Sequence, residues 1–120
     1  MTPERTAEID GARFGYPHIV RLRRIEDLGT LIRVAQDQRE AKMLAAHFSK
    51  VFGFRVTEAV VQAAAVIGAC WDADPPKRLE DVVVLSRTKG PLLLEMLRVC
   101  NELNGWADGP FGSAAGGSGC

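Results

Sequence analysis

The stretch GFRVTEAVVQAAAVIGACWDADPPKRLEDVVVL, residues 53–85, decides the fold of this chain. Thr57 offers a side-chain oxygen that can cap a helix, and Glu58 follows at the first helical position, where the helix dipole favours negative charge. Apolar side chains then recur at helical spacing on two neighbouring stripes: Val60, Ala64, Ile67 and Trp71, and Val61, Ala65 and Gly68. We expect a helix that is apolar over so much of its circumference to lie at the centre of the fold.

A proline corner ends this helix and sets the elements that follow. Asp74 precedes two prolines, and a residue before proline avoids helical backbone angles, so the chain must turn here. A short helix is predicted over about 79–85. Pro91 suits the first position of a last helix, and Gly105 suits the left-handed residue that ends it.

Two further helices are predicted before the central one. The segment 19–38 begins with a short extended stretch and continues as a helix whose apolar face carries Leu28, Leu31, Ile32 and Ala35. Residues 41–52 form a second core face, and Gly53 is a suitable stop. The polar run 36–42 either continues the first helix as an exposed face or marks a bend into the second.

Length and composition predict one domain. A chain of 120 residues with 47% hydrophobic residues can bury a single core, and its formal net charge of zero gives no overall attraction to nucleic acid or to an anionic membrane. Glycine and proline interrupt residues 1–18, and residues 107–120 are glycine-rich. The sequence predicts an all-α domain of four or five helices over 19–106, with a flexible N-terminal arm over 1–18 and a disordered tail over 107–120.

Apolar runs and cysteines predict a cytoplasmic protein. The apolar runs are far shorter than the roughly 20 residues that cross a bilayer, and residues 1–10 contain no signal-peptide core. The cysteines are too widely spaced for a metal-binding pair and odd in number. Cys70 and Cys100 are predicted to be buried as small apolar side chains, and Cys120 to be an exposed thiol.

The chain lacks the patterns that support catalysis. His18 and His47 have no second metal ligand near them in the sequence, and no nucleotide-binding loop is present. The acidic pairs 26–27 and 80–81 stand near helix starts, where they cap and solubilise. We expect a non-enzymatic protein without catalytic residues, metal or cofactor.

The last helix carries more apolar side chains than one core stripe needs. Leu93, Leu97 and Cys100 form one stripe, and further apolar residues lie beside it. Either both stripes are core, or the surplus binds a partner. We predict that the partner-binding residues are Leu92, Leu94, Val99 and Leu103.

Arg21, Arg23 and Arg24 are the alternative contact site. Three arginines in four residues could bind phosphates. Glu26 and Asp27 follow directly and no aromatic residues interleave, which favours a solvated edge. We do not expect nucleic acid as a partner, and a small helical DNA-associated regulator is kept as an alternative function.

Three segments, in this order, resemble the tail assembly chaperones of long-tailed bacteriophages of the lambda type. They are LRRIEDLGTLIRVAQ (22–36), FRVTEAVVQAAAVIGACWDADPP (54–76) and LLLEMLRVCNELNGW (92–106). The second is a capped apolar helix that ends in tryptophan and a proline corner. The third is the leucine-rich helix ending in Glu-Leu-Asn-Gly that recurs in this family.

The resemblance implies a function. Members of this family bind the tape measure protein, a long helical chain with apolar faces, and keep it soluble until tail-tube subunits polymerise around it. A longer form made by ribosomal frameshifting binds the tail tube protein. Such a chaperone acts in the host cytoplasm and is not expected in the mature virion. A helical adaptor that dimerises through its apolar helices remains an alternative, and self-association into a homo-oligomer stays open.

Overall fold

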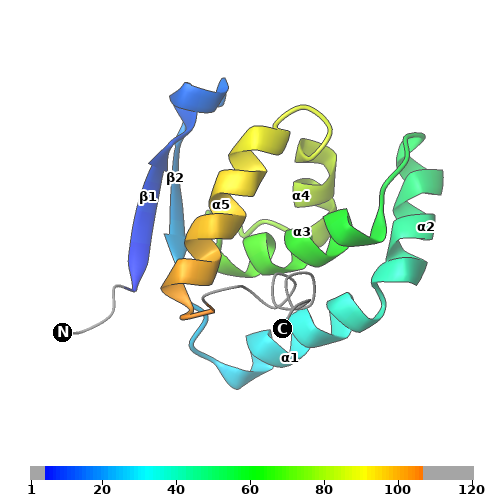
Figure 1. The fold of residues 1–120 in the computed structure, drawn as a ribbon, viewed down its shortest axis with the longest axis horizontal. Coiled ribbons are helices and arrows are strands. Elements are labelled where there is room, and N and C mark those ends of the chain that lie inside the picture. The colour runs from blue at the N-terminus through cyan, green and yellow to red at the C-terminus, as the bar shows by residue number, and fades with distance from the viewer. Residues whose placement is uncertain (1–4, 107–120) are drawn as a thin grey trace, which may run out of the picture.

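A β-hairpin followed by five helices makes up the fold of residues 5–106, which are the residues that the computed structural model describes (Figure 1). The elements are β1 (Thr6–Asp10), the short 3₁₀-helix η1 (Gly11–Phe14), β2 (Ile19–Arg23), α1 (Leu28–Arg39), α2 (Ala41–Phe52), α3 (Glu58–Cys70), α4 (Leu79–Leu85) and α5 (Gly90–Leu103).

Helix α3 is the central helix, as predicted. It contacts each of the other four helices, and its side chains are buried along most of its length. The Thr57 hydroxyl caps it by accepting a hydrogen bond from the Val60 N–H over 3.3 Å. Val61 and Val66 are fully buried on different sides of the helix, which explains why its apolar character extends over more than one stripe.

Local signals placed most helix ends correctly. Helix α2 ends at Gly53, whose φ of 75° is left-handed. Gly105 takes the same conformation after α5, where its N–H donates to the Glu102 carbonyl and the Trp106 N–H donates to the Asn101 carbonyl. Helix α1 ends at Arg39 and α2 begins at Ala41, so the polar run between them marks a bend.

The all-α prediction holds in its coarser form, because the described residues are mostly helical with one small two-stranded sheet added, whereas the prediction of a flexible arm over 1–18 is wrong for residues 5–18. The antiparallel strands β1 and β2 pair Ile9 with Val20 and Ala7 with Leu22. Ile9, Val20 and Leu22 are buried, because alternate residues of each strand point inward. The domain therefore begins well before Ile19, and it is mostly helical with a small sheet.

Gly11 explains how the hairpin tolerates so many residues that break regular structure. Its N–H donates to the His18 carbonyl over 3.1 Å, and a Cβ at this position would lie 2.2 Å from that oxygen. The Asp10 carboxylate accepts from the Ala12 N–H and holds the start of η1. Glycine at position 11 lets its backbone approach that of His18 closely, so its presence in this segment is not a sign of disorder.

The hairpin packs along α5 and is tied to the end of α3. Helix α5 contacts β1, η1 and β2, and the hairpin lies beside it in Figure 1. Trp71 forms an isolated antiparallel bridge with Leu22, and the Asp72 N–H donates to the Arg21 carbonyl over 2.9 Å. The residues that directly follow α3 therefore run beside β2 before the chain reaches the proline corner.

Helix α1 presents its apolar stripe to solvent, so the prediction that this stripe is a core face is wrong. Leu28 is 70% exposed and Ile32 is 54% exposed, whereas Val34 is the residue that the helix buries. Helix α1 lies at the edge of the domain and packs against α3 and α2. The side of α1 that faces away from α3, which carries Leu28 and Ile32, is not covered by any of the described elements.

Candidate functional site: an apolar groove between α3 and α5

A groove of about 250 Å³ runs between α3 and α5. Its lining residues come from these two helices and from the end of α4: Ala59, Val60, Ala63, Ala64, Ile67, Ser86, Gly90, Leu93, Leu94 and Leu97. Ser86 supplies the one polar side chain in this lining. The groove is therefore suited to apolar groups and offers little for hydrogen bonding.

The groove arises from the unequal size of the facing side chains. On α3, alanines at positions 59 and 63 face it one helical turn apart, and on α5 the facing side chains include Leu94 and Leu97. Small side chains on one wall leave a depression beside large ones on the other. Leu94 is 70% exposed, and so a large apolar side chain lies at the edge of an apolar hollow.

A second hollow lies on the other side of Leu94, between η1 and α5. It has a volume of about 570 Å³, and its lining residues are Arg13, Phe14, Pro91, Leu94, Glu95, Leu97, Arg98 and Asn101. Leu94 and Leu97 line both hollows. The exposed surface of α5 is therefore a leucine ridge with a depression on each side.

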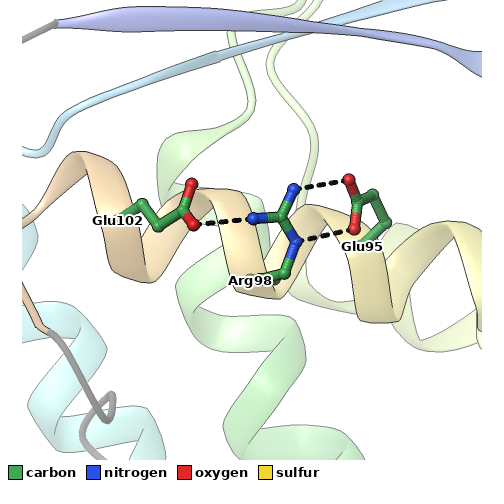
Figure 2. Close-up of polar contacts among 3 residues, drawn as sticks. All are labelled: Glu95, Arg98 and Glu102. Atoms are coloured by element: carbon green, nitrogen blue, oxygen red, sulfur yellow. Dashed lines mark hydrogen bonds and ion pairs between the residues drawn. The ribbon is translucent and has the colours of Figure 1, made fainter.

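Charged residues border this ridge on α5. The Arg98 guanidinium donates two hydrogen bonds to the Glu95 carboxylate, over 2.8 and 2.7 Å, and one to Glu102 over 2.6 Å (Figure 2). These bonds from Arg98 lower the pKa of Glu95. The network is exposed, so it contributes little to folding, but it gives the apolar surface a polar rim.

Of the predicted partner-binding residues, the structure leaves only Leu94 at the surface. Leu92 is 0%, Val99 8% and Leu103 7% exposed, so the expectation that they form an accessible face is wrong. Helix α5 packs on α3 and also on the hairpin, which covers the second apolar stripe. The sequence interpretation missed this because it treated the hairpin residues as a loose arm.

The predicted arginine cluster is divided by the structure. Arg21 donates to the Glu8 carboxylate, its cross-strand neighbour, over 3.0 Å. Arg23 lines a hollow between α1 and α3, and Arg23 and Arg24 together line an adjoining one at the start of α1, away from Arg21. The three side chains therefore do not form one phosphate-binding surface.

Cys70 and Cys100 are free and fully buried, as predicted. Two causes raise the pKa of Cys100 well above its ordinary value: mainly the hydrogen bond between its thiol and Cys70, and in addition its burial. The Cys100 side chain is therefore a neutral thiol at physiological pH. The prediction for Cys120 lies outside the described residues.

The two histidines considered as possible metal ligands, His18 and His47, lie against aromatic rings. The ring of His18 packs edge-on against Tyr16, and that of His47 lies 5.6 Å from Phe48. Over residues 5–106 no cluster of three histidine, cysteine or acidic side chains could hold a metal ion. Within the same residues, no helix has the length and apolarity needed to cross a membrane.

Comparison of the chain with protein-family models, with curated proteins and with solved structures found no match.

Proposed function

We propose that this protein is a phage tail assembly chaperone that binds an apolar helical face of the tape measure protein in the groove between α3 and α5. It keeps that partner soluble in the host cytoplasm until tail-tube subunits cover it. The proposal combines the family resemblance of the three sequence segments with the character of the groove.

The observation that carries the proposal is the exposed Leu94 beside an almost wholly apolar groove. Leu94 is 70% exposed, and a partner that covers it stabilises the complex by roughly 25 cal/mol for each Å² of apolar surface removed from water. An apolar groove can receive an amphipathic helix through the apolar side chains of that helix. The bound segment is expected to present apolar residues three and four positions apart.

The alanines of α3 favour a helical ligand over a flat surface. With Ala59 and Ala63 on one wall, the backbone of a bound helix can approach α3 closely while its larger side chains fill the space beside Leu94 and Leu97. The Glu95–Arg98–Glu102 network then lies at the edge of the contact, where polar groups keep their water.

A matched pair of leucines tests the site. Leu94 and Leu28 are both 70% exposed, but only Leu94 lines the groove. Each variant is co-expressed with a tape measure protein, and the soluble fraction of that partner is measured. The Leu94→Asp variant should lose most of the ability to keep the partner soluble. Leu28→Asp should behave as the wild type does, and both variants should retain wild-type thermal unfolding temperatures.

A second variant tests the groove itself. Ala63→Phe places a ring in the hollow and should block the partner, whereas Ala46→Phe on the exposed side of α2 should not. If folded Leu94→Asp and Ala63→Phe variants both keep the partner soluble, the binding surface lies elsewhere.

The helical adaptor alternative would use the same groove with a different partner. Sequencing of the region immediately downstream of the gene distinguishes the two: a very long coiled-coil reading frame there would support the chaperone. Without such a frame, the adaptor is the better account.

A further inference from the structure

A cleft of about 390 Å³ lies on another side of α3, between α1 and the loop that follows α3. Its floor is made of small residues of α3, Ala64, Ala65, Gly68 and Ala69. Its walls carry Arg23 at the end of β2, Arg33 on α1, and Lys77 and Arg78 in the loop. Side chains from three separate parts of the chain thus bring positive charge to one hollow.

Three of these cations form no ion pair among the described residues, although the charge of Arg33 acts on the nearby carboxylates of Asp37 and Asp27. Arg78 pairs with Glu80 and Asp81, but none of the ion pairs among residues 5–106 includes Arg23, Arg33 or Lys77. The Lys77 ammonium lies 5.1 Å from the centre of the Trp71 ring, an attraction that leaves its charge in place. Like charges around one hollow repel one another, and a bound anion would relieve that repulsion.

We propose that this cleft binds a compact oligophosphate anion. A phosphate monoester carries about −1.5 to −2 charges at neutral pH, and two linked phosphates together carry roughly three, so they can neutralise the three unpaired cations. The two arginines supply guanidinium groups, which bind phosphate oxygens in pairs. The cleft volume falls within the roughly 300–1,000 Å³ of small-molecule sites.

The acidic residues around the cleft favour a compact ligand over a nucleic acid. Asp37 and Glu80 line the cleft itself, and in the adjoining hollow Glu26 and Asp27 offset the charges of Arg23 and Arg24. An extended chain of phosphates that continued into the adjoining hollow would therefore gain no net attraction there. A compact anion can occupy the centre of the cleft among the unpaired cations.

Titration calorimetry of the intact protein with pyrophosphate, at constant ionic strength, tests this site. Arg33→Gln and Lys77→Gln should each weaken binding by about tenfold or more, because each removes a charge-assisted hydrogen bond. Arg55→Gln removes an exposed arginine outside the cleft and should leave affinity within about twofold. Asp37→Asn should strengthen binding, because it removes a carboxylate that faces the anion.

The site is overturned if the Arg55 variant loses as much affinity as the Arg33 variant, since the effect would then be one of total charge. It is also overturned if citrate binds as tightly as pyrophosphate, or if a single-stranded oligonucleotide binds more tightly and depends on the same side chains. Leu94→Asp should bind pyrophosphate normally, so this result is independent of the proposed chaperone function.

Discussion

The backbone N–H of Ile25 donates a hydrogen bond to Oδ1 of Asn104 over 2.9 Å, although the two residues are 79 positions apart. The Asn104 side-chain amide also donates to the Cys100 carbonyl over 2.8 Å and to the Cys70 sulfur over 3.4 Å. One side chain thereby joins the segment before α1 to the ends of α3 and α5.

Asn104→Ala should therefore destabilise the domain by about 1–3 kcal/mol, because it leaves the partly buried Ile25 N–H without an acceptor. Asn101→Ala in the last turn of α5 is the control, since the buried Oδ1 of Asn101 has no hydrogen-bond partner among the described residues. Urea unfolding of both variants measures the difference. Equal losses would mean that the Asn104 link contributes nothing of its own.

The hairpin should behave as part of the core. Ile9 is 5% exposed, and Ile9→Ala should cost about 2–5 kcal/mol of unfolding free energy. Ile19 is 66% exposed on the paired strand, and Ile19→Ala should stay within about 0.5 kcal/mol of the wild type. A flexible segment would instead leave both variants unchanged in chemical denaturation.

The buried and exposed leucines of α5 should differ in the same way. Leu92 is 0% exposed, and Leu92→Ala should cost about 2–5 kcal/mol, whereas Leu94→Ala should change stability by less than about 0.5 kcal/mol. Thermal unfolding checks both. A large loss at Leu94 would show that this residue supports the fold and would weaken its assignment to partner binding.

The ion-pair network on α5 should give a small, acid-sensitive contribution. The pKa of Glu95 is lowered from 4.5 by the hydrogen bonds from Arg98, so its contribution is present above that ordinary value and is lost as the pH falls through the lowered pKa. Unfolding midpoints of the wild type and Glu95→Gln should therefore differ slightly at pH 7 and converge once the pH is below the lowered pKa of Glu95. The difference at pH 7 should shrink in high salt. If the two midpoints differ equally at every acidic pH tested, the ionised carboxylate of Glu95 is not the cause of the difference.

Part of the candidate site was visible in the sequence. Leu94 was among the residues predicted to bind a partner, but the opposite wall of the groove was not. Ala59 and Ala63 lie four positions apart on α3 with Ile67 a turn beyond, a spacing that places small residues on one face. That pattern could have indicated a shallow face, although not which helix would lie across from it.

The sequence by itself determined the helices and most of their ends. The Thr57 cap, the left-handed Gly53 and Gly105 and the proline corner act within a few residues of the chain, and so their effects are readable without knowing the fold. Only the tertiary structure decided which apolar stripe is buried. Leu28 and Ile32 are exposed because the described elements leave that side of α1 uncovered, whereas Val99 is buried because a hairpin formed from residues distant in sequence packs along α5. Burial depends on neighbours that the fold brings together, and helical spacing alone does not identify them.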